Sequence, residues 1–257
     1  MSDWNPNLYR QFEKQRTQPA RDLVNSLDLK TVRCALDVGC GPGNSTALLA
    51  AKWPNAEIIG IDNSPSMIAQ ALRRVPSAQF ALKDATAGLS DLGCFDLVFS
   101  NAALQWMPSQ HALIGHLYAL LNECGALAIQ VPHTTNMGIR RAVNETAASD
   151  KWQGAFPNDN PPYYHDMTYY YDICTKLSSS FYLWETDYYH VMQNHEAILS
   201  WYKSTGLKPY LEQLDDMRNA EFAHDILARI REKYDVQPDG SVLFPYKRQF
   251  IVIYKDN

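Results

Sequence analysis

Residues 36–44 read Leu-Asp-Val-Gly-Cys-Gly-Pro-Gly-Asn, an apolar run followed by glycines at alternate positions. Gly39, Gly41 and Gly43 let the backbone turn sharply and approach a ligand closely, because glycine has no Cβ. A helix that begins at Asn44 would present unpaired N–H groups and a positive dipole end at the same place. In open α/β sheets, ligands bind outside the carboxyl ends of the strands. This stretch therefore predicts a ligand site at the end of a strand in an α/β sheet.

On both sides of this loop, short apolar runs alternate with helical patterns. The first half contains five predicted strands, at residues 34–38, 57–61, 78–82, 95–99 and 126–131. Helices are predicted between or before them, at 17–27, at 44–52, from Pro65 to just before Pro76, and at 110–121. Strands that alternate with helices are typical of βαβ units and a mainly parallel sheet.

The pattern changes after Pro132. Residues 151–166 are rich in proline, asparagine and aromatic residues, which predicts a long loop. Two further strands are predicted at 182–191 and 249–254, and helices are predicted around 170–173, at 196–203 and at 212–234. We therefore expect an α/β fold that is Rossmann-like. Its mainly parallel seven-stranded sheet has helices on both faces and a helical cap inserted in the C-terminal half.

Composition narrows the classes of partner. The 257 residues carry a net charge of −5 and no basic run, so nucleic acid is not an expected partner. No apolar stretch approaches the ~20 residues that a membrane-spanning helix needs, and the N-terminus lacks the pattern of a signal peptide. The five cysteines are odd in number and contain no CxxC pair, so we expect reduced thiols, no metal site and a cytoplasmic location.

The glycine spacing separates two classes of cofactor. The GxGxxG fingerprint of dinucleotide enzymes fits a pyrophosphate, whereas here the third glycine comes one residue early and Asn44 follows it. With Asp37 before the first glycine, the stretch resembles motif I of the class I S-adenosylmethionine-dependent methyltransferases. A nicotinamide-dependent oxidoreductase is the alternative from another enzyme class, and the spacing disfavours it.

Other strand ends in this half add polar groups. Asp62 ends the second strand, where a carboxylate can accept both ribose hydroxyls, although NAD enzymes share this acid. The resemblance implies that Asp84 meets the adenine amino group and that Asn101 lines the path to the substrate. Asp62 and Asp84 could instead be helix caps, and core packing is the stronger interpretation of Met67. The cofactor site that the resemblance implies comprises Asp37, Gly39, Gly41, Gly43, Asn44, Asp62, Asn63, Met67, Asp84, Ala85 and Asn101, with Trp4 and Tyr9 as an aromatic lid or as packing residues.

Motifs over nearly the whole chain are similar to the trans-aconitate 2-methyltransferase family. They include Asp3-Trp4-Asn5-Pro6, Leu104-Gln105-Trp106, Gln130-Val131-Pro132, Tyr170-Tyr171-Asp172-Ile173, Tyr188-Tyr189-His190, Thr205-Gly206-Leu207 and Arg248-x-Phe250-Ile251-Val252. The resemblance implies one methyltransferase domain over residues 1–257. Its S-adenosylmethionine-binding half would span 1–131, its substrate-side segments and helical insertions 132–247, and its final strand 248–255.

The implied reaction moves a methyl group from S-adenosylmethionine to a carboxylate of a small polycarboxylic acid, trans-aconitate first, and leaves S-adenosylhomocysteine. The alternatives are a carboxyl methyltransferase of another acid, such as a malonyl thioester carrier, and a non-catalytic S-adenosylmethionine-binding protein. A carboxylic acid with a pKa near ~4 is already ionised at neutral pH, so no general base and no metal are expected.

Such a site needs cations and hydroxyl groups for the other carboxylates. We rank Arg248, His190, Tyr171 and Tyr189 first, ahead of His133, Lys208, Trp106, Tyr170, Tyr188, Arg140 and Arg141. Tyr188 and Tyr189 are neighbours on a strand and should point to opposite faces. Two departures from the family concern the choice of acid: His133-Thr134-Thr135-Asn136 stands where Asp-Asn is usual, and Lys208 stands where Arg is usual.

Overall fold

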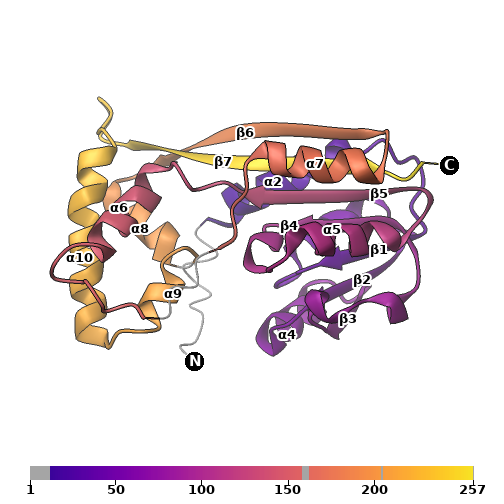
Figure 1. The fold of residues 1–257 in the computed structure, drawn as a ribbon, viewed down its shortest axis with the longest axis horizontal. Coiled ribbons are helices and arrows are strands. Elements are labelled where there is room, and N and C mark those ends of the chain that lie inside the picture. The colour runs from indigo at the N-terminus through magenta and orange to yellow at the C-terminus, as the bar shows by residue number, and fades with distance from the viewer. Residues whose placement is uncertain (1–11, 158–161, 204, 257) are drawn as a thin grey trace. The chain divides into compact units, whose positions relative to one another are not determined.

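The structure is a computed structural model that describes residues 12–157, 162–203 and 205–256 (Figure 1). It divides into two compact units. The first, here called the sheet unit, comprises residues 16–132, 163–186 and 248–257, and the second, called the helical unit, comprises residues 1–15, 133–162 and 187–247. The single domain over residues 1–257 stays a prediction.

One seven-stranded sheet contains the strands. They are β1 (Cys34–Val38), β2 (Glu57–Asp62), β3 (Gln79–Leu82), β4 (Phe95–Asn101), β5 (Leu121–Pro132), β6 (Phe181–Met192) and β7 (Val242–Tyr254), in the order β3-β2-β1-β4-β5-β7-β6. The pairs β1–β2, β1–β4, β2–β3 and β4–β5 are parallel, and β7 runs antiparallel to β5. The predicted mainly parallel α/β sheet is therefore confirmed, with β7 as its antiparallel member.

Helices cover both faces of the sheet. In the described part of the chain, the helices before β6 are α2 (Glu13–Ser26), α3 (Asn44–Lys52), α4 (Pro65–Arg74), α5 (Gln110–Ala119), α6 (Gly138–Ala147) and α7 (Met167–Leu177), with 3-10 turns η1 (Ala85–Ala87), η2 (Ser90–Leu92) and η3 (Leu104–Trp106). Leu36 and Val38 belong to the buried apolar cluster that α5 and α7 complete (Figure 1). Asp37 lies between them on the strand and bonds to α3, so α3 covers the opposite face.

Gln110, the first residue of α5, joins three other segments of the sheet unit. Its Nε2 donates to the carbonyl oxygens of Leu104 and Tyr163, both at 3.0 Å. Its Oε1 accepts a hydrogen bond from the Tyr170 hydroxyl at 2.9 Å. The buried side chain therefore fixes η3, the segment at residue 163 and α7 against the start of α5.

The helical unit contains α6 and three later helices, which are α8 (His195–Lys203), α9 (Lys208–Leu211) and α10 (Asp216–Lys233). In Figure 1, α10 packs along α6 and α8. Trp152, Trp201 and Phe222 are among its fully buried side chains, so aromatic rings form much of this core. The helix expected at 212–234 begins at Asp216, because the Asp215 side chain accepts the Arg218 N–H and caps it there.

Strand β7 is longer than the sequence predicts. It begins at Val242, and burial alternates up to Lys247 before it becomes continuous from Arg248 to Ile253. A strand with one covered face alternates, whereas a strand covered on both faces does not. Pro245 interrupts the apolar run in the first half, so only the second half has the composition of a buried strand.

No helix in the described part of the chain combines the length and the apolar character that crossing a membrane requires.

Candidate active site

The glycine loop connects β1 to α3 and is anchored on β2. The N–H groups of Gly39 and Cys40 donate to the Ile61 carbonyl at 2.8 and 2.9 Å. A Cβ added to Gly39 would lie 2.3 Å from the Cβ of Ala103, so only glycine fits there. Gly41 has a φ of 53°, and a Cβ added to it would meet nothing within 4 Å. The loop therefore packs tightly at Gly39 and leaves open space at Gly41, where a ligand can approach the backbone.

Asp62 is fixed at the carboxyl end of β2. Its Oδ2 accepts the Gly41 N–H at 3.0 Å, and its Oδ1 accepts the Ser64 N–H at 2.9 Å. An ionised carboxylate offers about four acceptor positions, so two backbone bonds leave capacity for hydroxyl donors. Asp62 is half-buried and lies beside the open space at Gly41. This placement suits the predicted contact with a ribose diol.

Asp37 lies beneath the glycine loop and is fully buried. Its Oδ2 accepts hydrogen bonds from the Ser45 hydroxyl at 2.7 Å and from the Thr46 hydroxyl at 2.6 Å. Burial raises the pKa of this carboxyl to about 6, although the two hydroxyl donors oppose the rise. Asp37 therefore holds the first turn of α3, and its effect on a ligand would be exerted through the loop.

Asp84 caps a short turn after β3. Its Oδ1 accepts hydrogen bonds from the N–H of Thr86 at 2.8 Å and from the Thr86 hydroxyl at 2.7 Å. These bonds lower the pKa of the exposed Asp84 carboxyl. Ala85 is buried and belongs to the core cluster. The capping interpretation of Asp84 is confirmed, and its contact with adenine stays a prediction.

The end of β4 has a strained backbone. Ala102 adopts a φ of 53°, which costs a residue other than glycine roughly 1–2 kcal/mol. Two hydrogen bonds hold it, because its N–H donates to the Gln130 carbonyl at 2.8 Å and its carbonyl accepts from Gln105 Nε2 at 2.7 Å. Strained backbone of this kind gathers at functional sites. It directly follows Asn101, which is half-buried.

Gln130 is a candidate that our ranking of the sequence passed over. Its side chain is fully buried near the end of β5 and pairs in register with Asn101 of β4. Within the described residues, neither polar atom of the Gln130 amide has a hydrogen-bond partner. Buried amides are normally bonded, so Gln130 is suited to bind a ligand. The signal in the sequence is a single polar residue inside the apolar run Ala126-Leu127-Ala128-Ile129-Gln130-Val131.

The remaining cofactor candidates differ in exposure. Gly43 is buried, Asn44 and Met67 are half-buried, and Asn63 is exposed. Trp4 and Tyr9 lie outside the described residues. No group of three or more His, Cys, Asp or Glu side chains suited to a metal ion occurs among the residues that the structure describes.

In the sheet unit, the substrate candidates occupy different environments. Arg248 lies within β7 opposite Pro132 of β5, and only 6% of it is exposed. Its position is therefore interior to the strand and buried, whereas the prediction placed it at the start of the strand. Trp106 is 44% exposed and Tyr171 is 52% exposed. Tyr170 is buried and its hydroxyl bonds to Gln110.

In the helical unit, two of the candidates are buried histidines. The His190 ring stacks on Trp201 with ring centroids 4.8 Å apart, and the His133 N–H donates to the Lys247 carbonyl at 3.0 Å. The others differ in exposure. Tyr189 is exposed and Tyr188 is half-buried, as expected of neighbours on a strand. The Lys208 ammonium pairs with the Glu212 carboxylate at 3.7 Å, and Arg141 is exposed whereas its neighbour Arg140 is buried.

Comparison with known proteins gives consistent matches. A family model described as a methyltransferase domain matches residues 35–125. The chain is 39% identical over 252 residues to a trans-aconitate 2-methyltransferase of Escherichia coli (strain K12 / DH10B), covering 98% of each chain. The same identity and coverage apply to a trans-aconitate 2-methyltransferase of Shigella flexneri.

Solved structures match the fold at low sequence identity. The YcgJ protein from Bacillus subtilis has a TM-score of 0.60 at 12% identity, covering 93% of this chain and 99% of that chain. Phosphoethanolamine N-methyltransferase 2 of Haemonchus contortus, solved in complex with S-adenosyl-L-methionine, has a TM-score of 0.56 at 19% identity, covering 93% and 53%. The predicted class I methyltransferase fold is confirmed by these matches together with the strand order.

Proposed function

Because the chain belongs to the trans-aconitate 2-methyltransferase family, we propose that it transfers a methyl group from S-adenosylmethionine to a carboxylate of trans-aconitate. The products are a monomethyl ester and S-adenosylhomocysteine. The observation that carries the proposal is the extent of the match, since 39% identity spans 98% of both chains and includes the C-terminal half. A match confined to the glycine loop and its neighbouring strands would support only the cofactor.

The proposed reaction needs no general acid or general base from the protein. The bound cofactor supplies an electrophilic methyl group on a sulfonium sulfur. A carboxylate is ionised near neutral pH, so one of its oxygens forms the new C–O bond while the C–S bond breaks and its electron pair stays on sulfur. No proton moves in this step. The chain's residues must therefore align the acid and remove its water, and they need not deprotonate it.

The sheet unit supplies groups that fit the cofactor. Asp62 accepts the ribose hydroxyls, and the open space at Gly41 lets the cofactor approach the loop backbone. Gln130 offers a buried amide to the polar groups of the ligand. Asp37 acts as a positioning residue, because its carboxylate is engaged with Ser45 and Thr46. Each of these roles is part of the proposal.

We also propose a cytoplasmic enzyme that acts on a small molecule, and that binds neither nucleic acid nor membrane. All five cysteines lie in the described part of the chain and none forms a disulfide, which accords with a reducing compartment. The net charge of −5 does not favour nucleic acid.

A labelled-methyl assay tests the function. Purified protein is incubated with methyl-labelled S-adenosylmethionine and, separately, with trans-aconitate, cis-aconitate, citrate and a malonyl thioester carrier. We expect the highest kcat/KM with trans-aconitate and a monomethyl ester by mass spectrometry. A higher kcat/KM with the malonyl thioester carrier would show that the carrier, and not trans-aconitate, is the substrate. Binding of S-adenosylhomocysteine without methyl transfer to any of the acids would indicate a non-catalytic binding protein.

A further inference from the structure

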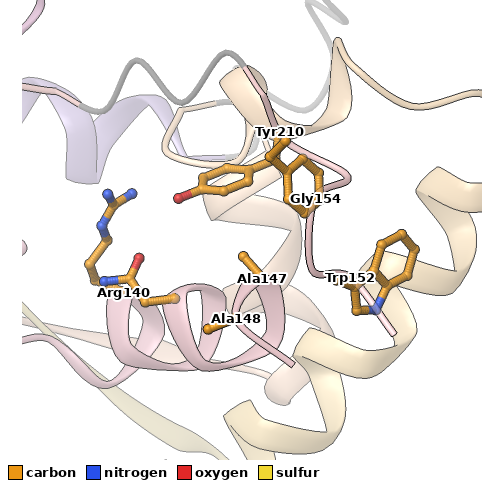
Figure 2. A pocket seen from close by; sticks show the side chains of 8 residues that line it. Arg140, Ala147, Ala148, Trp152, Gly154 and Tyr210 are labelled. Carbon is orange, nitrogen blue, oxygen red and sulfur yellow. The ribbon is translucent and has the colours of Figure 1, made fainter. Parts of the chain in front are cut away.

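The helical unit and the sheet unit each contain a feature that could receive a small molecule. In the helical unit it is a pocket of about 360 Å³, lined by Arg140, Trp152 and Tyr210 among others (Figure 2). Arg140 and Tyr210 already have interactions within the protein, so neither side chain needs a ligand. In the sheet unit it is a pair of amides at the ends of β4 and β5. The amides are the stronger candidate, because they contain buried polar atoms that the described residues leave without a hydrogen bond.

Gln130 and Asn101 lie side by side in the sheet. They are register partners on the parallel strands β5 and β4, whose backbones run roughly 4.7–4.9 Å apart. Leu127, Ile129 and Val131 belong to the apolar cluster on one face of the sheet. Because side chains alternate along a strand, Gln130 and its partner Asn101 point to the other face. The two amides therefore share one face at the end of the β4–β5 pair.

The polar atoms of this pair are buried and unsatisfied. The side chain of Gln130 is fully buried, and within the described residues neither its Oε1 nor its Nε2 has a hydrogen-bond partner. Oδ1 of Asn101 is also buried and without a partner there, although the residue as a whole is half-buried. Buried amides are normally bonded, because burying one without a hydrogen bond destabilises the fold. An amide that is retained at such a cost is a candidate for ligand binding.

The pair lies next to the loop proposed to hold the cofactor. The N–H of Ala102 donates to the Gln130 carbonyl at 2.8 Å, and Ala103 packs so closely on Gly39 that a Cβ added there would lie 2.3 Å from its own. In the strand order β3-β2-β1-β4-β5, Asp62 of β2 lies on one side of the glycine loop and the amide pair on the other. If Asp62 holds the ribose, the amides lie toward the opposite end of the cofactor, which carries the sulfonium and the amino acid tail.

The charges of the proposed reaction favour a neutral group at this point. An anionic carboxylate oxygen and a cationic sulfonium become a neutral ester and a neutral thioether, as the C–O bond forms and the C–S bond breaks with its electron pair left on sulfur. A cation bound to the reacting carboxylate would therefore stabilise the substrate more than the transition state and slow the step. An amide N–H can orient the same carboxylate and loses less as the charge disappears.

We propose that Nε2 of Gln130 donates a hydrogen bond to the reacting carboxylate of the acceptor acid and orients it toward the methyl group. Asn101 lies one strand nearer to the glycine loop and meets the amino acid tail of the cofactor, whose ammonium can donate to its Oδ1. The inference rests on the proposed function and deepens it, because it names the group that holds the reacting carboxylate. Cationic side chains suit the carboxylates that do not react, whose charge persists.

Gln130→Met provides the main test, since methionine has nearly the same length and no amide. Because the amide has no partner within the described residues, its removal should leave the free energy of unfolding in urea unchanged or higher. In contrast, kcat/KM for trans-aconitate should fall about 10- to 150-fold, the range for one hydrogen bond to a charged group. The fall should be mainly in kcat, because the bond orients the nucleophile. The affinity for S-adenosylhomocysteine, measured calorimetrically, should not change.

Asn122→Leu is the matched control, because it removes an amide from the same strand. Asn122 lies near the start of β5, roughly 25 Å from Gln130 along the strand, and its Nδ2 donates to Asp96 at 2.8 Å. This variant should lose stability and keep the kinetic constants of the unmodified protein. A Gln130→Met variant that behaves in the same way, less stable and fully active, overturns the proposal.

Gln130→Glu distinguishes the acid from the cofactor as the partner of the amide. Glutamate keeps the shape of the side chain but replaces its donor NH₂ group by an acceptor. If the amide meets the acid, kcat/KM should fall further than in Gln130→Met, because two carboxylates repel each other. If kcat/KM is kept, or the affinity for S-adenosylhomocysteine rises, the amide oxygen accepts from the cofactor's ammonium and the proposal is wrong.

Gln130→Asn is the second variant, for the case that Gln130→Met does not fold. It keeps an amide but shortens its reach by one methylene group. Because the donor then lies too far from the acid, kcat should fall while the affinity for S-adenosylhomocysteine stays the same. A normal kcat in folded Gln130→Asn overturns the proposal.

Calorimetric titration of trans-aconitate into protein saturated with S-adenosylhomocysteine separates this inference from the proposed function. If Gln130→Met weakens binding of the acid but the unmodified protein forms no ester, Gln130 binds the acid and the proposed reaction falls. If the unmodified protein forms the ester and Gln130→Met has the same kcat and KM, the reaction stands and Gln130 is not its orienting group.

Discussion

The backbone N–H of Gly41 donates a hydrogen bond to Oδ2 of Asp62 at 3.0 Å. This bond joins the middle glycine of the loop after β1 to the acid at the end of β2. The two residues are 21 positions apart in the chain, yet they form one local structure. The acid therefore orders the loop and keeps acceptor capacity beside the open space at Gly41. Under the proposed function, a substitution at either residue should affect cofactor binding.

Asp62→Ala should weaken binding of S-adenosylhomocysteine by about 10- to 150-fold, because bonds to a charged group are worth about 1.5–3 kcal/mol. Calorimetry measures the affinity. Asp91→Ala is the control, since it removes an exposed acid that pairs with Lys83 in the same unit. Equal affinity in the Asp62 variant and the control would show that Asp62 serves only the loop.

Alanine substitutions at Gly39 and Gly41 should distinguish a glycine that is needed for packing from a glycine that is needed for ligand binding. Gly39→Ala places a Cβ 2.3 Å from that of Ala103, and overpacking costs about 1–3 kcal/mol beyond the backbone strain. Gly41→Ala meets no atom within 4 Å, so it should carry only a backbone cost of roughly 1–2 kcal/mol. Urea unfolding should show the larger loss at Gly39. Gly41→Ala should lower the affinity for S-adenosylhomocysteine, and a normal affinity there would place the cofactor elsewhere.

The contribution of Asp37 to stability should fall as pH rises from about 4 to about 6. Its pKa is raised from 3.8 to about 6 in the folded state, so in this window the folded protein binds more protons than the unfolded chain. The contribution is fully present below the unfolded pKa and is lost as pH rises through the folded pKa. The rise corresponds to about 3 kcal/mol. Urea unfolding of the protein and of Asp37→Asn at several pH values should show a smaller decline in the variant.

The rate at saturating trans-aconitate should be nearly constant between about pH 6 and 8. The nucleophile is a carboxylate that is already charged in this range, so no base has to titrate. The measurement is kcat from initial rates in buffers of constant ionic strength. A steep rise of kcat across the window would indicate a hydroxyl nucleophile and a general base, and the proposed substrate class would then be wrong.

Arg248→Ala should raise the KM for trans-aconitate by the equivalent of about 2–5 kcal/mol if this arginine binds a substrate carboxylate. Its burial within β7 means that the same change also lowers stability, so the free energy of unfolding must be measured alongside. Arg248→Lys keeps the charge and loses the planar fork, and it should also raise KM. A normal KM in Arg248→Lys, with stability lost only in Arg248→Ala, would make Arg248 a structural residue of the strand.

Much of the sheet unit follows from local patterns in the sequence. Strand β1 and helix α3 have the predicted bounds, because an apolar run, a glycine loop and a helical pattern follow one another without ambiguity. The start of β7 does not follow, since Pro245 interrupts the apolar run in the first half of the strand and only the second half has the composition of a buried strand. Burial of Arg248 depends on tertiary packing around the strand, which no local pattern encodes.

The sequence indicates which residues belong to the candidate site better than it indicates what each side chain contacts. Asp37 and Asp62 were both predicted from their places at strand ends. Only the structure shows that Asp37 is engaged with the hydroxyls of α3 while Asp62 is half-buried beside Gly41. The positive φ of Ala102 had no signal in the sequence, because alanine is not a residue type that favours it.

The side chain of Gln110 uses both ends of its amide, with two carbonyl oxygens at the nitrogen and one hydroxyl at the oxygen. Replacing it by glutamate preserves its shape and needs a single nucleotide change in the codon. That change would replace the NH₂ group that donates to the carbonyl oxygens of Leu104 and Tyr163 by a carboxylate oxygen, which can only accept. It would also bury a negative charge. Position 110 should therefore tolerate almost no natural variation. In a genetic screen, Gln110→Glu should be a severe loss-of-function allele although it changes the shape of the side chain very little.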